Sequence, residues 1–209
     1  MSLNNNHYKA GFAEHYADNA SPVWDIGKPQ QPFITHAEQI QGPILDIGCG
    51  TGSVAIFFAR RGEEVTAIDF VDDAVARASQ KAQEAGVNVH FRVQDFFTLD
   101  TAGRKYKSII DSGLLHIFSG DEQRKQQYVS IVSQLLDDDG RLFLLASRKS
   151  HAGDNGLTAE EIYATFSDAL IIESLEEFVA ETVPGAAEEV SGKVWLTWFV
   201  VIKKAGPAK

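Results

Sequence analysis

A short apolar run that ends in three closely spaced glycines constrains this chain more than any other stretch. Residues 44–52 read Ile-Leu-Asp-Ile-Gly-Cys-Gly-Thr-Gly, and a helical pattern follows from Ser53 to Arg61. Glycine tolerates positive φ and lets a ligand approach bare backbone, so a strand, a glycine loop and a helix in this order are typical of a nucleotide-type cofactor site. The spacing here is G-x-G-x-G, whereas the dinucleotide fingerprint needs G-x-G-x-x-G.

An acidic residue, Asp46, stands two positions before the first glycine and completes a D-x-G-x-G-x-G pattern. With this pattern the chain resembles the class I S-adenosylmethionine-dependent methyltransferases, whose first motif has this form. The resemblance implies that S-adenosylmethionine is the cofactor and that the loop contributes to its site through Asp46, Gly48, Cys49, Gly50 and Gly52. Asp46 has an alternative interpretation as an ordinary strand-end acid that caps the turn, and Cys49 as a small loop residue.

A second apolar strand, residues 64–69, ends in Asp69, seventeen residues after Gly52. Rossmann-type folds place a carboxylate near this position on the ribose hydroxyls of the cofactor. Each charge-assisted hydrogen bond from the diol would contribute roughly 1.5–3 kcal/mol. Asp69 and the adjacent Phe70 are therefore expected in the cofactor site. Alternatively, Asp69 is the N-cap of the next helix.

Two further strand ends follow in the order that the resembled family shows. Residues 89–93 lead into Asp95 and Phe96, which the resemblance places at the adenine, the acid near its amine and the ring against its face. Asp95 could equally form an Asx turn. Residues 106–110 form a fourth strand that leads into Asp111, the family's fourth motif, at the carboxyl edge of the sheet where open α/β folds bind ligands.

Strands and helices alternate along the chain, which indicates a parallel sheet covered on both faces. We expect a helix over residues 72–84 that Gly86 stops, and an apolar helical stripe at five positions: Tyr128, Ile131, Val132, Leu135 and Leu136. Residues 137–140 predict a turn before a buried strand at 141–146. Candidate capping boxes span residues 119–122 and 158–161, the second opening a short helix that ends at Phe166.

The tail lacks a helix between two strand-like segments, residues 169–183 and 191–204. This favours an antiparallel hairpin, which is how the resembled fold ends its seven strands. The predicted fold class is α/β, a Rossmann-like doubly wound seven-stranded sheet that is mostly parallel. We expect an N-terminal helical or lid segment over residues 1–42 and a methyltransferase domain over residues 43–209.

Residues 21–32 contain helix-breaking prolines around Trp24 and precede the first strand. The segment is similar to a Pro-Trp-Asp-x-Gly-x-Pro-x-Pro stretch of the thiopurine, thiol and halide methyltransferases, although Val23 is inserted before Trp24 and Gln31 precedes Pro32. The resemblance predicts a lid in which Trp24 contacts the cofactor sulfonium, with up to ~2 kcal/mol of cation–π attraction. Alternatively, Trp24 only packs the N-terminal helix onto the sheet.

The fourth motif departs from the plant halide and thiol enzymes, which have an Asp-Tyr-aromatic run. Residues 111–118 instead read Asp-Ser-Gly-Leu-Leu-His-Ile-Phe, which disfavours halide methylation and leaves an apolar pocket edge. His116 is the best candidate for a general base, and its alternative is a helix-start histidine bonded to backbone. A thiol already supplies some thiolate near neutrality, so no dedicated base is obligatory.

The composition of the chain limits the classes of binding partner that we expect. The net charge is −10 and the pI is near 5.0, which argues against a nucleic-acid or anionic-membrane surface. The polar N-terminus predicts no signal peptide, and a single cysteine suits a reducing cytoplasm. We therefore expect a cytoplasmic monomer or homodimer with a small-molecule substrate, no nucleic-acid or membrane partner and, because its histidines are scattered, no metal.

Together these features predict an S-adenosylmethionine-dependent methyltransferase that acts on a small molecule, with a thiol or another soft nucleophile as the expected acceptor. Three alternatives remain. The acceptor could be an oxygen or nitrogen atom of a specialised metabolite. It could be a nucleic acid or a protein, although the acidic charge disfavours nucleic acid and the chain has no Asn/Asp-Pro-Pro-aromatic motif. The chain could also bind the cofactor without methyltransferase activity.

Overall fold

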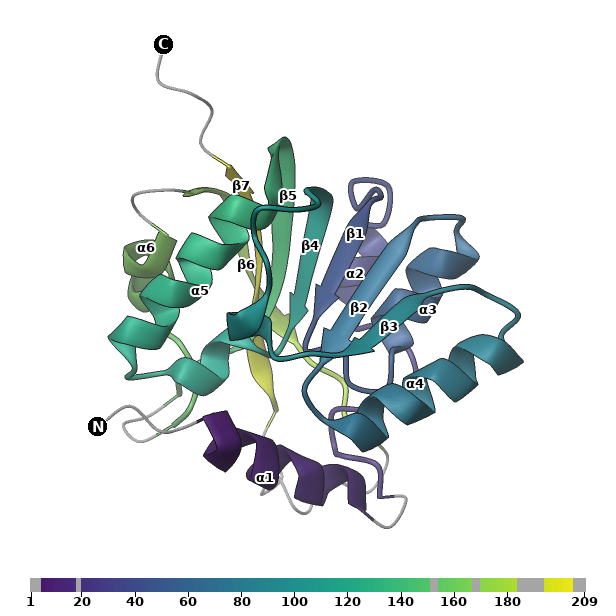
Figure 1. Cartoon of the computed structure of the whole chain (residues 1–209). Coiled ribbons are helices and arrows are strands. Elements are labelled where there is room, and N and C mark those ends of the chain that lie inside the picture. The colour runs from purple at the N-terminus through teal and green to yellow at the C-terminus, as the bar shows by residue number, and fades with distance from the viewer. Residues whose placement is uncertain (1–4, 18–19, 151–153, 167–169, 184–193, 205–209) are drawn as a thin grey trace.

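The computed structural model describes residues 5–17, 20–150, 154–166, 170–183 and 194–204. One mixed sheet runs through this part of the chain in the order β3-β2-β1-β4-β5-β7-β6 (Figure 1). Its strands are β1 (Ile44–Ile47), β2 (Val65–Asp69), β3 (His90–Val93), β4 (Tyr106–Ser112), β5 (Leu136–Ser147), β6 (Leu170–Val179) and β7 (Leu196–Lys204). β1 to β5 pair in parallel, and β7 lies antiparallel between β5 and β6. The Rossmann-like seven-stranded fold with a C-terminal antiparallel pair is confirmed.

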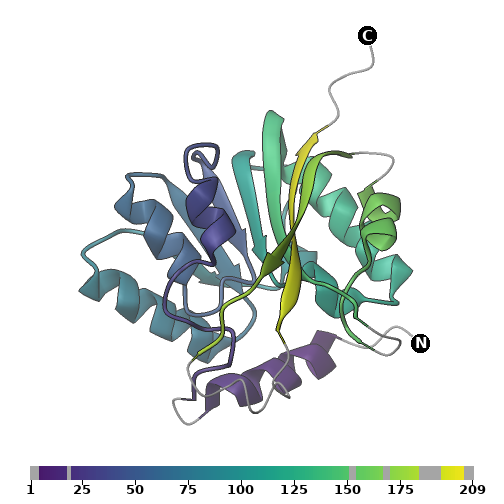
Figure 2. The same ribbon diagram turned by 180° about the vertical axis from the view of Figure 1, so that it is seen from behind.

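Helices cover both faces of the sheet (Figures 1 and 2). One face carries α2 (Gln31–Thr35), α3 (Ser53–Arg60) and α4 (Asp72–Glu84); the other carries α5 (Glu122–Leu135) and α6 (Ala159–Phe166). Two short 3-10 turns, η2 (Phe96–Thr98) and η3 (Leu115–Phe118), follow β3 and β4. Helix α1 (Asn5–Tyr16) crosses the carboxyl ends of the parallel strands. No helix within the described ranges is both long and apolar enough to cross a membrane.

The sheet forms because its central strands are apolar on both sides. In β5, Leu142 and Leu144 belong to the core beneath α5 and α6, whereas Phe143 and Leu145 belong to the core beneath α2 and α3. All four side chains are buried. Strands that bury both faces are typical of the parallel sheets of α/β proteins.

Several predicted elements are confirmed. Helix α4 spans residues 72–84 as predicted, and Gly86 follows it with a φ of 67°. The four stripe residues on α5 are buried, and the fifth, Leu136, opens β5 instead. A reciprocal capping box precedes α6: the Thr158 N–H donates to Glu161 Oε2 (2.8 Å), and the Glu161 N–H donates to Thr158 Oγ1 (3.1 Å).

One local prediction is wrong and another is right only in part. The N-cap of α5 is Asp121, whose carboxylate accepts from the Arg124 N–H (3.0 Å), whereas the Ser119 hydroxyl donates to the Gly156 carbonyl (2.9 Å). Residues 137–140 lie within β5 rather than before it, but they form a bulge. Leu136 pairs with Tyr106 and Arg141 with Ser108, so the four residues between them have no partner on β4. Of the predicted C-terminal strand segments, residues 169 and 191–193 lie outside the described residues.

The segment before β1 is tied to the segment after β6. The side-chain amide of Gln30 donates to the Glu181 carbonyl (2.8 Å) and accepts from the Glu181 N–H (2.9 Å). The Val183 N–H also donates to the Val23 carbonyl (3.1 Å). The Gln30 side chain thereby pairs both backbone groups of Glu181, as a neighbouring strand would.

Gly52 is fixed by both backbone conformation and space. Its φ is +79°, and an added Cβ would lie 2.9 Å from Ala78 Cβ and 2.9 Å from Phe91 Cζ. We expect Gly52→Ala to lower the free energy of unfolding by about 2–4 kcal/mol, because left-handed strain and overpacking add. Urea titration followed by circular dichroism measures this loss.

Gly62→Ala is the matched control, because Gly62 has a φ of +89° and open space around the added Cβ. Its free energy of unfolding should fall by only about 1–2 kcal/mol, because backbone strain is the single cost of alanine at this position. Equal losses in the two variants would contradict the crowding at Gly52.

Candidate functional site

The glycine loop after β1 adopts a conformation that other residues rarely reach. Gly48, Gly50 and Gly52 have φ values of 67°, 52° and 79°. The Cys49 N–H donates to the Ile68 carbonyl (2.9 Å), which holds the loop against β2. Burial raises the pKa of the Cys49 thiol, so this side chain is protonated at neutral pH and fits a loop residue better than a nucleophile.

Asp69, at the end of β2, holds the glycine loop in place. Its carboxylate accepts from the Gly50 N–H (2.9 Å) through one oxygen and from the Val71 N–H (2.9 Å) through the other. Burial raises its pKa, and these backbone donors oppose the shift. Each carboxylate oxygen has a further lone pair for a ligand hydroxyl. The N-cap alternative does not describe this residue, since the N-cap of α4 is Val71.

Asp111, at the end of β4, binds the next loop in the same way. Its carboxylate accepts from the backbone N–H groups of Gly113 (3.0 Å), Leu114 (2.6 Å) and Leu115 (3.0 Å). The Tyr128 hydroxyl also donates to it (2.7 Å). Burial raises the pKa of Asp111 to about 6, and the Tyr128 hydroxyl and the three N–H groups oppose this rise.

Asp46 on β1 differs from these two carboxylates. It is 1% exposed, and neither of its oxygens has a hydrogen-bond partner among the described residues. Burial and the nearby charges of Asp111 and Asp69 raise its pKa to about 7, although the nearby Ala55 backbone N–H opposes this rise. A buried carboxyl group without donors is costly to ionise, so this site favours a proton or a positively charged ligand.

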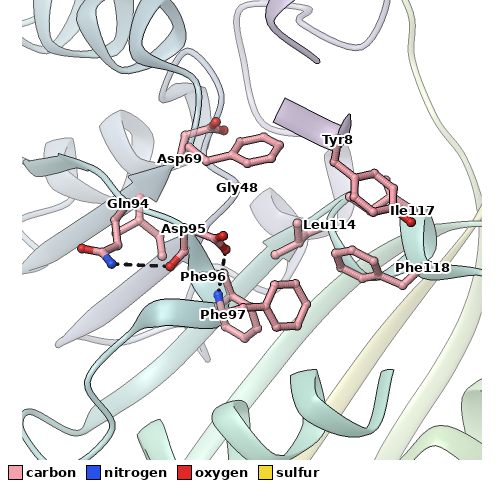
Figure 3. Close-up of a pocket in the computed structure, with 12 residues that line it drawn as sticks. Tyr8, Gly48, Asp69, Gln94, Asp95, Phe96, Phe97, Leu114, Ile117 and Phe118 are labelled. Atoms are coloured by element: carbon pink, nitrogen blue, oxygen red, sulfur yellow. Dashed lines mark hydrogen bonds between the residues drawn. The ribbon is translucent and has the colours of Figure 1, made fainter. Parts of the chain in front are cut away.

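A pocket opens at the carboxyl ends of these strands (Figure 3). Five residues expected in the cofactor site line it: Gly48, Asp69, Phe70, Asp95 and Phe96. Figure 3 shows Asp95 and Phe97 on one side and Tyr8 and Phe118 on the other, with Leu114 between them. The remaining lining is mostly apolar, and the position agrees with the rule that open α/β sheets bind ligands where the strand order reverses.

Asp95 combines both interpretations that the sequence left open. It lines the pocket, and its carboxylate also accepts from the Phe97 N–H (2.9 Å), which makes it the N-cap of η2. Phe96 beside it is buried and packs against Phe97 at 5.3 Å between ring centroids. The turn therefore aims an acid and an aromatic ring into one space.

Seven other residues line the pocket: Tyr8, Ile68, Gln94, Phe97, Leu114, Ile117 and Phe118. Of these, Leu114, Ile117 and Phe118 belong to the apolar pocket edge expected within residues 111–118, and the other four were not expected. Tyr8 comes from α1, and its ring lies 5.7 Å from that of Phe118 in an edge-on arrangement. Gln94 and Phe97 are adjacent in sequence to Asp95 and Phe96, so the sequence could have indicated that they also line the site. No local pattern pointed to Tyr8.

Trp24 does not line this pocket. Its ring lies 5.0 Å from that of His15 and 6.2 Å from that of Phe12, both on α1, which is the packing alternative. The neighbouring Asp25 instead reaches the glycine loop, where it accepts from the Thr51 hydroxyl (2.6 Å). Helix α1, rather than residues 21–32, contributes a side chain to the pocket lining, that of Tyr8. The same helix buries Tyr16 against the glycine loop, where its hydroxyl lies 3.0 Å from an ideal Cβ on Gly50.

His116, on η3, also does not line the pocket. Its Nδ1 atom is buried and has no hydrogen-bond partner in the described part of the chain. Burial lowers its pKa to about 4, although the charge of Asp154 opposes this. The ring is therefore neutral at pH 7. Across the described ranges, no three His, Cys, Asp or Glu side chains gather in a way that could hold a metal ion.

The chain is similar to known methyltransferases in sequence. Residues 44–140 match the family described as "Methyltransferase domain". A 2-heptyl-1-hydroxyquinolin-4(1H)-one methyltransferase of Mycobacteroides abscessus is 36% identical over 100 residues, 46% of this chain and 44% of that protein. An uncharacterized methyltransferase of Schizosaccharomyces pombe is 30% identical over 104 residues, 49% of this chain and 70% of that protein. The chain thus spans less than half the length of the first of these relatives.

A solved structure is similar over nearly the whole chain. It was described for the conversion of a disulfide bond into a thioacetal group during echinomycin biosynthesis, and it is 25% identical with a TM-score of 0.80. The similarity covers 96% of this chain and 94% of that one. It therefore includes the N-terminal and C-terminal segments that lie outside the matched domain.

The raised pKa of Asp46 predicts a pH-dependent stability. Between the unfolded pKa of about 3.9 and the folded pKa of about 7, the folded chain keeps a proton that the unfolded chain loses, so stability falls as pH rises. We expect Asp46→Asn to remove this fall. Between pH 5 and pH 8 the free energy of unfolding of the native chain should fall by about 1–3 kcal/mol relative to that of the variant.

Asp139→Asn is the control, since Asp139 is exposed. This variant should show the same dependence of the free energy of unfolding on pH as the native chain. Denaturant titrations at several pH values compare the three proteins. Parallel profiles for the native chain and Asp46→Asn would show that Asp46 ionises normally in the folded state.

Proposed function

Because the chain belongs to the class I S-adenosylmethionine-dependent methyltransferases, we propose that it methylates a small-molecule acceptor at sulfur, either a thiol or another soft nucleophile. The observation that carries the cofactor assignment is the convergence of Gly48, Asp69 and Asp95 on one pocket. Bound S-adenosylmethionine supplies an electrophilic methyl group on a positively charged sulfur.

The pocket lining fits the nucleoside part of this cofactor. Two neighbouring strand ends each present a carboxylate followed by an aromatic residue, Asp69 with Phe70 and Asp95 with Phe96. A ribose diol and an adenine amine are hydrogen-bond donors, and carboxylates are acceptors. We assign the ribose to Asp69 and the adenine to Asp95, with the two rings as apolar walls.

The methionine part carries an ammonium group and needs an acceptor of opposite charge. We assign it to the glycine loop and to the buried carboxyl groups beside it, Asp46 and Asp111. The two unpartnered oxygens of Asp46 support this assignment, because a cationic donor would satisfy them. Gly48, Cys49, Gly50 and Gly52 form the loop backbone that such a group would approach.

Two observations support sulfur as the acceptor atom. The structure that is similar over 96% of this chain is named for chemistry at a disulfide. The neutral His116, with a pKa of about 4, is a weak base, and a thiol with a pKa near ~8.5 ionises enough near neutrality to need none. An alcohol acceptor would need a stronger base.

An oxygen or nitrogen acceptor is the second candidate. The Mycobacteroides abscessus relative is named for a hydroxyquinolinone, and its identity of 36% is higher than that of the thioacetal-forming protein, although it spans only 46% of this chain. His116 would then be the candidate base. The subgroup of thiopurine, thiol and halide methyltransferases is proposed here on the sequence around Trp24 alone.

We propose that residues 1–42 cover the site and that residues 43–209 form the methyltransferase domain. Tyr8 supports a covering role, since it comes from α1 and lines the pocket. Trp24 would act through α1, against which it packs. Excluding water from the reacting groups is the contribution expected of such a cover.

S-adenosylhomocysteine formation tests the proposal. The full chain is incubated with S-adenosylmethionine and a panel of alkyl and aryl thiols, sulfide, halides, phenols, hydroxyquinolinones and amines. We expect turnover with thiols that exceeds turnover with phenols at least about tenfold, because thiols need no base. Turnover confined to oxygen or nitrogen acceptors would overturn the sulfur assignment, and cofactor binding without turnover on any acceptor would leave only a binding protein.

The role of Asp69 predicts a graded loss of cofactor affinity. Asp69→Asn keeps one acceptor oxygen but removes the charge, and Asp69→Ala removes both. We expect the dissociation constant for S-adenosylhomocysteine to rise about tenfold in the first variant and up to about 100-fold in the second, equivalent to about 1–3 kcal/mol. Isothermal titration calorimetry measures both.

Asp73→Asn is the matched control, because Asp73 is exposed on the first turn of α4 and lies outside the pocket lining. Its affinity should equal that of the native chain. An unchanged dissociation constant in a folded Asp69→Ala variant would remove Asp69 from the cofactor site.

A further inference from the structure

Tyr128 on α5 connects the two walls of the pocket without lining it. Its side chain is fully buried. The hydroxyl donates to Asp111 Oδ2 (2.7 Å), and the ring lies 5.2 Å from the ring of Phe96 with an angle of 42° between the planes. Asp111 belongs to β4 and Phe96 to η2, so one side chain touches the elements on both sides of the pocket.

The first wall depends on Asp111. Its two oxygens together accept four hydrogen bonds, of which three come from consecutive backbone N–H groups at residues 113–115. The same loop continues into η3 and supplies Leu114, Ile117 and Phe118 to the pocket. The orientation of the Asp111 carboxylate therefore fixes where this wall begins.

The second wall depends on Phe96. It is 5% exposed, lines the pocket and follows Asp95, the acid assigned to the adenine. Its ring contacts the Tyr128 ring on the side of α5. A change in the Tyr128 ring would therefore reach Phe96 directly, while a change in the hydroxyl reaches only Asp111.

We propose that Tyr128 is a positioning residue that sets the separation of the two pocket walls, and that it thereby controls the affinity for the cofactor. The hydroxyl holds the loop of residues 113–115 through Asp111, and the ring supports Phe96. This inference rests on the proposed function for the identity of the ligand, but its effect on the loop does not.

The hydroxyl also affects the charge of Asp111. Its hydrogen bond lowers the pKa of that carboxyl group, so Tyr128→Phe raises it above about 6. Asp111 then becomes protonated at a higher pH and loses strength as an acceptor for the loop. The titratable groups that interact with it are Tyr128 on α5 and Asp46 on β1. The charge of Asp111 raises the pKa of Asp46, so protonation of Asp111 at a higher pH in Tyr128→Phe weakens that effect.

Tyr128→Phe is the test, because it keeps the ring on Phe96 and removes only the hydroxyl. Tyr106→Phe is the control: Tyr106 is buried at the start of β4, at the opposite end of that strand from Asp111. Two measurements are made on the full chain. One is amide hydrogen exchange at residues 113–115 without cofactor, and the other is the dissociation constant for S-adenosylhomocysteine from pH 5.5 to 8.5.

We expect Tyr128→Phe to speed exchange at residues 113–115 and to raise the dissociation constant about tenfold, as the loss of one hydrogen bond to a charged group predicts. Its loss of binding at low pH should begin at a higher pH than in the native chain. Tyr106→Phe should leave all three observations unchanged.

Native exchange at residues 113–115 in Tyr128→Phe would overturn the positioning role whether or not the cofactor binds. Faster exchange with an unchanged dissociation constant and pH profile would overturn its control of affinity. Equal effects in Tyr106→Phe would reduce the role to general core stability. A native chain that fails to bind S-adenosylhomocysteine would instead refute the proposed cofactor and, with it, the claim about affinity, while exchange still decides the role of Tyr128 in the loop.

Discussion

Hydrogen bonds from backbone N–H groups to buried carboxylates hold both loops that border the pocket. Asp69 accepts from the glycine loop, and Asp111 accepts from the loop after β4. A buried carboxylate needs hydrogen-bond donors, and a tight loop at a strand end has backbone N–H groups that lack acceptors. The hydrogen bonds between them therefore satisfy both the carboxylate and the loop backbone. Asp46 lies beside these acids, and neither of its oxygens accepts a hydrogen bond among the described residues. A proton or a cationic ligand would satisfy these two oxygens.

The sequence allowed most of the fold to be predicted because the strands of this sheet are apolar on both sides and the helices are marked at their ends. Helix α4 agrees at both boundaries, and the Thr158–Glu161 box is present. The prediction was right only in part at residues 137–140, where three aspartates and a glycine have strong turn preference. These residues lie within β5, but Leu136 pairs with Tyr106 and Arg141 with Ser108, so they form a bulge that has no partner on β4.

The strand-end residues of the site were also predictable, because parallel strands bring their carboxyl ends to one edge of a sheet. Gly48, Asp69 and Asp95 each follow an apolar run and do meet in one pocket. Tyr8 could not be found in this way, since its contact with Phe118 joins residues 110 positions apart. The same reason explains Trp24: its type and neighbours suited a lid, but the docking of α1 decides what its ring touches.

The pairing of Gln30 with Glu181 has a consequence for the order in which the chain is made. Gln30 precedes every strand of the sheet, whereas Glu181 follows β6. β6 joins the sheet only through β7, so during synthesis the segment before β1 waits, without this anchor, until all seven strands have left the ribosome. The glycine loop and strands β1 to β5 can assemble in that interval, and the N-terminal segment is anchored after the sheet is complete.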